Sequence, residues 1–203
     1  LEAIRLASGV RVQRHGGPGA LTTLRFRGMR SFDSAVLIDG FRFRDPAAPQ
    51  GEATGFLSDL LVTNVARVEM LRGSGSSLYG SHATGGVLNI LSDTGGGPWH
   101  GSVDLEGGGL GFLRATMRAA GSALNERIHI GAGYTHLNVL EGLDGNDRYR
   151  NHSAHAAGQY LFSPSTRVVA RLLAVDSFLQ LNDSPFAAPD EWLPASGVVP
   201  ARP

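Results

Sequence analysis

Residues 68–90 read VEMLRGSGSSLYGSHATGGVLNI, and no other part of the sequence is as informative about the architecture of the chain. An apolar run typical of a β-strand ends on Arg72-Gly73, and a turn of small residues follows that carries one aromatic side chain, Tyr79. Gly85-Gly86 then leads into a second apolar run. Glycine and serine in such positions favour tight turns between strands. The stretch therefore predicts two strands joined by a closely packed turn.

The composition excludes several classes of function. The 203 residues carry 18 basic and 18 acidic side chains, and every basic residue is arginine. This zero net charge gives no reason to expect nucleic acid as a partner. The absence of cysteine excludes disulfides, thiol catalysis and Cys-ligated metal. Both ends of the sequence are abrupt, and we expect a fragment of a longer protein.

The first half of the chain predicts a small α+β domain. Short apolar runs are separated by irregular, glycine-rich connections, as in a small mixed sheet with short helices. The expected strands are 23–27, 34–38, 67–71 and 87–91, and a short helix is expected over 55–61. Asp39-Gly40 is expected to form a turn in which Gly40 takes a positive φ. We do not assign a catalytic role to Asp39, because no partnered acid, base or nucleophile lies near it in the sequence.

After Pro98 the pattern changes to five runs in which apolar and polar residues alternate. The runs are 101–107, 113–119, 127–136, 153–162 and 167–175. Several have about 9–11 residues, the length that crosses a bilayer at a tilt, and Tyr160 and Phe162 lie where an interfacial aromatic girdle would be. A soluble sandwich or barrel remains the alternative, since alternation fits any half-buried antiparallel sheet.

The connections between these runs favour the membrane barrel. Connections 121–126 and 163–166 are short, whereas 137–150 is long and polar. Short turns at one end and long loops at the other are typical of outer-membrane barrels. Connection 108–112 is a mild exception, because it is short at the end where long loops are expected.

An ordered series of motifs carries a family resemblance. Gly9-Val10 is followed by glycine-rich 16–19, Arg27-Gly28, the run 36–40 (VLIDG), Arg67-Val68-Glu69, Arg72-Gly73, Tyr79-Gly80 and the run 85–90 (GGVLNI). In this order the series resembles the plug domain of TonB-dependent outer-membrane receptors and is similar to the vitamin B12 and siderophore branches. The resemblance implies an α+β plug in residues 1–94, a linker in 95–99, and about five strands of an incomplete antiparallel transmembrane β-barrel in 100–203.

The resemblance also implies a function. In such receptors a plug fills a barrel of about 22 strands in the bacterial outer membrane. TonB pulls the plug from the periplasm, and a scarce ligand such as an iron–siderophore or cobalamin then passes. We expect a monomer in contact with outer-membrane lipid, with no cofactor and no enzymatic activity, and we expect the TonB-contacting segment to precede residue 1. The ligand is not identified. A soluble β-rich binding or adhesion protein is the alternative.

Two arginines are the expected plug-barrel latch. In the family, plug arginines at these motifs pair with barrel glutamates, which assigns the role to Arg27 and Arg72. A guanidinium suits this role because it stays charged when buried and binds carboxylates in a bidentate way. The alternative is a pair of solvated arginines at strand ends.

Two loops are expected to contact ligand by analogy with the family. One covers 13–20 and offers Gln13, Arg14 and His15. The other covers 44–50 and offers Arg44, Asp45 and Gln50. Both are polar and rich in turn residues, so ordinary loop chemistry is the alternative.

One acidic segment is a candidate calcium site. Residues 141–147 read EGLDGND, and Asp144, Asn146 and Asp147 could supply clustered oxygen ligands. The spacing is not that of an EF-hand, and a solvated hairpin tip is the alternative.

Overall fold

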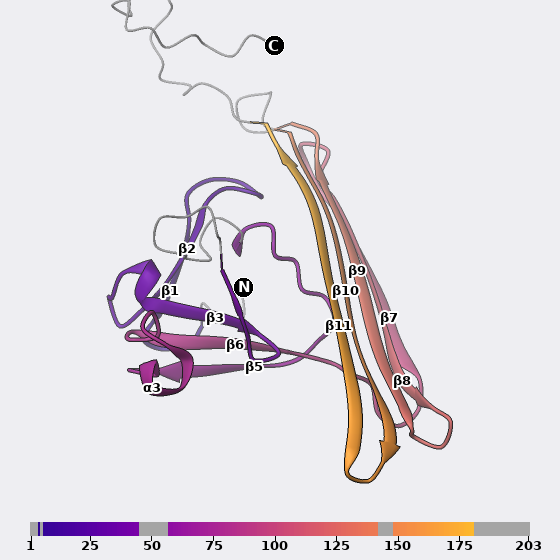
Figure 1. Ribbon diagram of the computed structural model, residues 1–203. Helices are drawn as coiled ribbons and strands as arrows, with labels where there is room; N and C mark the ends of the chain where they lie inside the picture. Colours follow the sequence, from indigo (N-terminus) through magenta and orange to yellow (C-terminus); the bar gives the residue numbers. More distant parts are fainter. Residues whose placement is uncertain (1–3, 5, 45–56, 142–147, 181–203) are drawn as a thin grey trace, which may run out of the picture.

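The computed structural model describes residues 4, 6–44, 57–141 and 148–180, and it contains three sheets. A four-stranded mixed sheet and a two-stranded hairpin form one body, and a five-stranded antiparallel sheet stands beside it as a tall curved wall (Figure 1). The order of strands is β4-β3-β6-β5 in the mixed sheet and β11-β10-β9-β8-β7 in the wall.

The first body is built from short elements. The strands are β1 (Val10–Arg14), β2 (Thr22–Phe26), β3 (Ser34–Ile38), β4 (Phe41–Phe43), β5 (Val65–Arg72) and β6 (Gly86–Ser92), with a 3-10 turn η1 (Ser31–Asp33) and a short helix α3 (Ser76–Tyr79). The hairpin β1-β2 is a separate two-stranded sheet, and β3 and β6 are parallel. A core of buried apolar side chains lies between these strands and includes Leu24, Phe26, Val36, Leu57 and Leu88.

The stretch 68–90 forms the predicted pair of strands with a closely packed turn. β5 and β6 pair antiparallel, and α3 occupies the connection. The turn is closed by hydrogen bonds from Gly73 N to the Gly85 carbonyl and from Gly75 N to the Ala83 carbonyl. A side chain at Gly86 would place its Cβ 2.5 Å from the Phe26 ring. The double glycine therefore lets β6 pass against the core residue Phe26.

The wall consists of five long strands. They are β7 (His100–Gly107), β8 (Leu113–Ala123), β9 (Ile128–Val139), β10 (Tyr149–Ser163) and β11 (Thr166–Leu179). Alternate residues face the first body, and the others form an exposed face with large apolar side chains, among them Val103, Leu105, Met117, Ile130, Phe162, Val168 and Leu172. In the described part of the chain, no helix is long and apolar enough to cross a membrane.

Most elements lie where the sequence places them, and four differ. Gln13 and Arg14 are in β1 and not in a loop, because their backbone pairs with Thr23 and Thr22 of β2. Phe41–Phe43 forms a strand that the pattern did not predict, and the turn at 76–79 is helical. The helix expected over 55–61 is not formed over 58–61: Leu57 is helical, 58–59 form a turn and 60–61 have no regular structure, while residues 55 and 56 lie outside the described region.

The turn between β3 and β4 follows the prediction. Asp39 and Gly40 have φ of 51° and 82°, as a two-residue hairpin turn with two left-handed positions requires. Asp-Gly is a preferred sequence for this turn. This turn directs the Asp39 carboxylate toward the wall, where it pairs with Arg171 of β11.

The core position of Leu88 gives a first testable expectation. Leu88 is fully buried between the strands, so Leu88→Ala should cost about 2–5 kcal/mol in the opening free energy of the mixed sheet. Hydrogen exchange of β3 and β6 amides in the intact chain measures this cost. Leu78→Ala is the control, because Leu78 is 79% exposed and its loss should change exchange little. Equal exchange in the two variants would contradict the assigned core.

Candidate functional site

The inward face of β10 is a ladder of buried polar side chains directed at the first body. Tyr149, Asn151, Ser153 and His155 alternate along the strand, and none is more than 2% exposed. Buried polar groups need hydrogen-bond partners, because an unpaired one carries its full desolvation cost. Partners for these side chains come from the first body, which makes the contact between the two sheets the candidate functional site.

Asp59 of the first body forms hydrogen bonds with the ladder residues at the start of β10. The Tyr149 hydroxyl donates to Asp59 Oδ1 at 2.8 Å, and Asn151 Nδ2 donates to the Asp59 carbonyl at 3.0 Å. Ser153 Oγ donates to Asn151 Oδ1 at 2.7 Å. Ser153 Oγ also lies 3.4 Å from the Asp59 carbonyl, so Asp59 contacts all three of these ladder residues.

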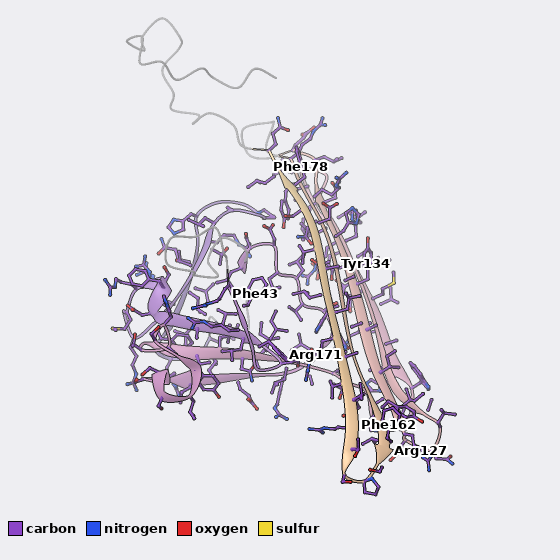
Figure 2. The ribbon with its side chains drawn as sticks, in the orientation of Figure 1. Phe43, Arg127, Tyr134, Phe162, Arg171 and Phe178 are labelled. Atoms are coloured by element: carbon purple, nitrogen blue, oxygen red, sulfur yellow. The ribbon has the colours of Figure 1, made fainter. Side chains whose placement is uncertain are left out.

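Asp39 lies near the last ladder residue, His155, and is connected to it through Ser92. Its carboxylate accepts hydrogen bonds from Ser92 N at 2.7 Å and from Ser92 Oγ at 2.6 Å, and it forms an ion pair with Arg171 Nε at 3.0 Å. Ser92 ends β6, and Arg171 projects from β11 toward the first body (Figure 2). The Asp39 side chain is only 4% exposed. A buried charge of this kind requires both the cation and the hydrogen bonds.

His155 completes this group, which we call the Asp39 junction (Asp39, Ser92, His155 and Arg171). His155 Nε2 lies 2.9 Å from Ser92 Oγ. Since the single hydroxyl hydrogen of Ser92 points to Asp39, the geometry requires His155 Nε2 to donate. His155 Nδ1 then has no hydrogen-bond partner among the described residues. The junction therefore joins two strands of the wall to two elements of the first body.

Glycines on β9 allow the backbones of the two bodies to touch. A Cβ at Gly131 would overlap the Asp93 carbonyl oxygen, and a Cβ at Gly133 would overlap Thr63 Oγ1. Asn64 Nδ2 donates to the same Asp93 carbonyl at 2.6 Å, which fixes the segment after β6 against the segment before β5. Close approach of this kind is possible only where the wall has no side chain.

The segment between the bodies is also bonded to the wall. Ser122 donates through its backbone N and its Oγ to the Gly97 carbonyl, at 3.1 and 2.7 Å. His129 Nδ1 lies 3.1 Å from the Gly95 carbonyl. A Cβ at Gly95 would lie 2.5 Å from the Ile130 carbonyl. The expected linker is therefore laid along β8 and β9 and does not stand free.

Comparison with known proteins points to one family. The family model described as the TonB-dependent Receptor Plug Domain matches residues 1–87. The chain is similar to TonB-dependent receptors. We accordingly call the first body the plug and the five-stranded sheet the barrel wall.

Curated relatives and solved structures agree with this assignment. The vitamin B12 transporter BtuB of Vibrio cholerae serotype O1 is 30% identical over 193 residues, which cover 90% of this chain and 31% of the relative. The siderophore receptor PirA of Acinetobacter baumannii has a TM-score of 0.68 at 17% identity and covers 88% of this chain and 29% of its own. The pyoverdine-bound receptor FpvA of Pseudomonas aeruginosa has a TM-score of 0.70 at 18% identity, over 87% of this chain and 22% of its own.

These matches settle the broad predictions. The chain spans about a third of the length of the curated relatives that it matches. The predicted resemblance to TonB-dependent receptors and the predicted outer-membrane location are confirmed, and the combination of a plug with barrel strands is confirmed as the fold. The comparisons do not support the soluble binding or adhesion alternative.

The predicted latch arginines lie together, away from the barrel wall. Arg27 follows β2 and Arg72 ends β5, and both approach Gly9. Arg72 Nη1 donates to the Ser8 carbonyl at 3.0 Å and to Ser8 Oγ at 2.8 Å. Within the described ranges neither arginine forms an ion pair with a carboxylate. Their pairing with barrel glutamates stays a prediction.

The other predicted residues are placed only in part. Gln13 and Arg14 end β1, and His15 donates its backbone N–H to the Leu21 carbonyl. Arg44 follows β4, whereas Asp45, Gln50 and the candidate calcium ligands Asp144, Asn146 and Asp147 lie outside the described residues. Within the described residues, no group of acidic, histidine or cysteine side chains could hold a metal ion.

Two separate cavities lie between the plug and the wall. One has a volume of about 580 Å³ and is lined by Arg14 of β1, by Arg114, Thr116 and Arg118 of β8, and by Tyr149. The other has a volume of about 410 Å³, lies beside β11 at the Asp39 junction, and is lined in part by Phe41, Phe43 and Arg42. Burial, and then the neighbouring Arg44, lower the pKa of Arg42. The plug is therefore in close contact with β9 and β10 and more loosely packed against β8 and part of β11.

Sequence reasoning missed the junction. It assigned Asp39 to a turn, which the structure shows, and it predicted an alternating strand over 167–175 without giving Arg171 a role. The pairing of Asp39 with Arg171 was not predictable, because nothing in the spacing states which plug residue meets which wall residue.

The Asp39 junction should be the strongest polar tie between plug and wall. Asp39→Asn leaves Arg171 without its carboxylate and should lower the opening free energy of the 39–40 turn and β6 by about 3 kcal/mol. Asparagine tolerates the left-handed turn, so the backbone should be kept. Hydrogen exchange in the intact chain measures the change. Glu69→Gln, which removes an exposed pair with Arg67, is the matched control and should cost about 0–1 kcal/mol.

The glycines of β9 give a steric test. Gly131→Val should displace the Asp93 segment, because the new side chain meets a backbone carbonyl that cannot rotate away. Ala132→Val changes the opposite face of the same strand and should be tolerated. Limited proteolysis of the linker region reports the displacement as faster cleavage. Equal cleavage in both variants would show that the plug does not press on β9.

Proposed function

We propose that this chain forms the plug and the first barrel strands of an outer-membrane receptor for energy-coupled uptake of a scarce ligand, such as an iron–siderophore or cobalamin. In this proposal residues 1–94 form an α+β plug, 95–99 a linker and 100–203 the first strands of a transmembrane barrel. The plug is the gate, TonB is the partner that displaces it, and the receptor works as a monomer without catalytic residues.

The nature of the plug–wall contact supports a gate. It consists largely of hydrogen bonds from Asp59 and the Asp39 junction to β10 and β11. A hydrogen bond that is exchanged for one to water has a net value of only about 0.5–1.5 kcal/mol. Two smaller apolar contacts add to it, Leu173 against the plug core and Leu61 against Leu137. Such a contact holds the plug in one position, and a force on the plug can separate it because water replaces the broken hydrogen bonds.

The relatives suggest the class of ligand. Their names include a vitamin B12 transporter, siderophore receptors and a copper transporter. We propose that the end of β1, the loop after it and the segment after β4 meet the ligand, through Gln13, Arg14, His15, Arg44, Asp45 and Gln50. We further propose that Arg27 and Arg72 pair with carboxylates of the complete barrel, and that calcium binds Asp144, Asn146 and Asp147.

A covalent lock tests whether the plug must move. A Cβ at Gly133 would lie 3.0 Å from Thr63 Cβ, close to the spacing of about 3.5–4.5 Å in disulfides. The chain has no cysteine of its own, so Thr63→Cys with Gly133→Cys creates a single pair. The oxidised double variant of the complete receptor should bind ligand and lose uptake, and a reductant should restore uptake.

The assay uses cyanocobalamin and ferric siderophores as probes, in cells that depend on the receptor. Each single cysteine variant is a control, and its transport should not depend on oxidant, whatever the contact of the new Cβ of Gly133→Cys with Thr63 does to its basal rate. Uptake that persists in the fully oxidised double variant would show that this face of the plug does not open. Failure of all probes to enter with the unaltered receptor would count against the proposed ligand class.

A further inference from the structure

One histidine of the wall joins the linker to a turn of the wall. His129 lies near the start of β9 and is half-buried. Its Nδ1 is 3.1 Å from the carbonyl oxygen of Gly95 in the linker, and its Nε2 is 2.7 Å from the carbonyl oxygen of Glu126 in the turn between β8 and β9. A carbonyl oxygen can only accept a hydrogen bond, so both ring nitrogens have to donate. The geometry therefore requires the imidazolium form of His129.

A second histidine repeats this arrangement at the other end of the linker. His100 is the first residue of β7, and its Nδ1 lies 3.1 Å from the Pro98 carbonyl oxygen. Its Nε2 lies 3.2 Å from Asp93 Oδ2. An ionised carboxylate is also only an acceptor, so His100 can donate to both partners only as an imidazolium. The Asp93 carboxylate favours the protonated ring, and Arg118 of β8 opposes it.

The neighbours of His129 on the adjoining strands are uncharged. Ser122 of β8 and Gln159 of β10 stand opposite it in the register, and the linker presents glycines 95–97 to it. Glu126 and Arg127 are the nearest charged residues along the chain, and Glu126 contacts the ring through its backbone carbonyl. The charge of this ring is therefore balanced chiefly by carbonyl dipoles.

The other hydrogen bonds of the linker do not depend on a histidine proton. Ser122 donates to the Gly97 carbonyl, and Asn64 donates to the Asp93 carbonyl. These donors are a hydroxyl and an amide, which stay in one form over the physiological range of pH. The two histidine contacts are thus the part of the attachment that a change of pH can break.

Both histidines lie at the end of the wall that has the short turns. The turn after β8 and the two-residue turn 164–165 are at this end, where Arg127 and Phe162 are seen (Figure 2). Short turns face the periplasm in outer-membrane barrels. Histidine is the side chain that ordinarily changes its charge between about pH 5 and 8. The attachment of the linker is therefore placed to respond to the pH of the periplasm.

We propose that His100 and His129 form a pH-dependent clasp, which docks the linker on the wall when both rings are protonated and releases it when they are neutral. A neutral ring directs a nitrogen lone pair at an oxygen that cannot donate, so one of its two contacts becomes repulsive. Because docking requires the protons, it is favoured on the acid side and is lost as the pH rises. Release leaves the Asp39 junction in place and removes the fixed connection of the plug to β8 and β9. The clasp is independent of ligand uptake.

A spin label on the linker of the complete receptor measures docking. The label is attached to Gly96→Cys, because Gly96 is exposed and a Cβ there meets no atom closer than 3.8 Å. In this labelled parent the ratio of immobile to mobile label should fall by about tenfold between about pH 5.5 and about pH 8. His100→Gln with His129→Gln should leave the label mobile at both values, since a glutamine amide does not titrate and cannot donate from two opposite sides. His82→Gln is the matched control, because His82 has one bonded ring nitrogen, and it should keep the pH response.

Nitrogen-15 NMR of labelled histidines reads the protonation of the rings directly. The signals that disappear in His129→Gln should be those of a doubly protonated ring at about pH 5.5. Loss of the mobility change in the double variant, with the change kept in His82→Gln, supports the clasp. Equal mobility at both pH values in the labelled parent, a pH response that survives in the double variant, or a singly protonated His129 at about pH 5.5 would overturn it.

Discussion

The closed arrangement depends on the buried carboxylate of Asp39. A charge with a 4% exposed side chain is stable only with its partners in place. Its direct partners are Ser92 of β6 and Arg171 of β11, and Ser92 is in turn bonded to His155 of β10. If Arg171 is withdrawn, the carboxylate and the hydroxyl of Ser92 lose the cation that compensates their desolvation. The position of the plug against the wall is thereby tied to one hairpin turn, whose Asp-Gly sequence sets the direction of the carboxylate.

The three wall strands β8, β9 and β10 contact the plug in different ways. β9 offers glycines and lets backbone meet backbone, while β10 offers a ladder of polar side chains that finds acceptors on Asp59 and a hydroxyl on Ser92. β8 instead borders a cavity lined by arginines and Thr116. The plug is held along β9 and β10 and leaves cavities beside β8 and β11, an arrangement that suits the proposed gate.

The sequence predicts secondary structure here better than it predicts contacts. Alternation identified all five wall strands, and apolar runs identified β2, β3, β5 and β6, because both signals are local. β1 was hidden because its end adjoins the glycine-rich 16–19, which favours a loop, and β4 has only three residues. The pairing of Asp39 with Ser92 joins residues 53 apart, and the chain shows no local sign of it. Which inward-facing residues come together depends on the register of the strands, and that register is not visible in the local sequence.

The two-stranded hairpin β1-β2 has a mechanical consequence. β1 is bonded to one neighbour only, whereas β6 lies between β3 and β5 and continues through the linker into the wall. Removing β1 breaks one ladder, and removing β6 breaks two. A load that enters from the start of the chain therefore meets its weakest element first. Since Arg14 of β1 lines the larger cavity, loss of that single strand would widen the space beside β8 while the remaining plug strands stay anchored.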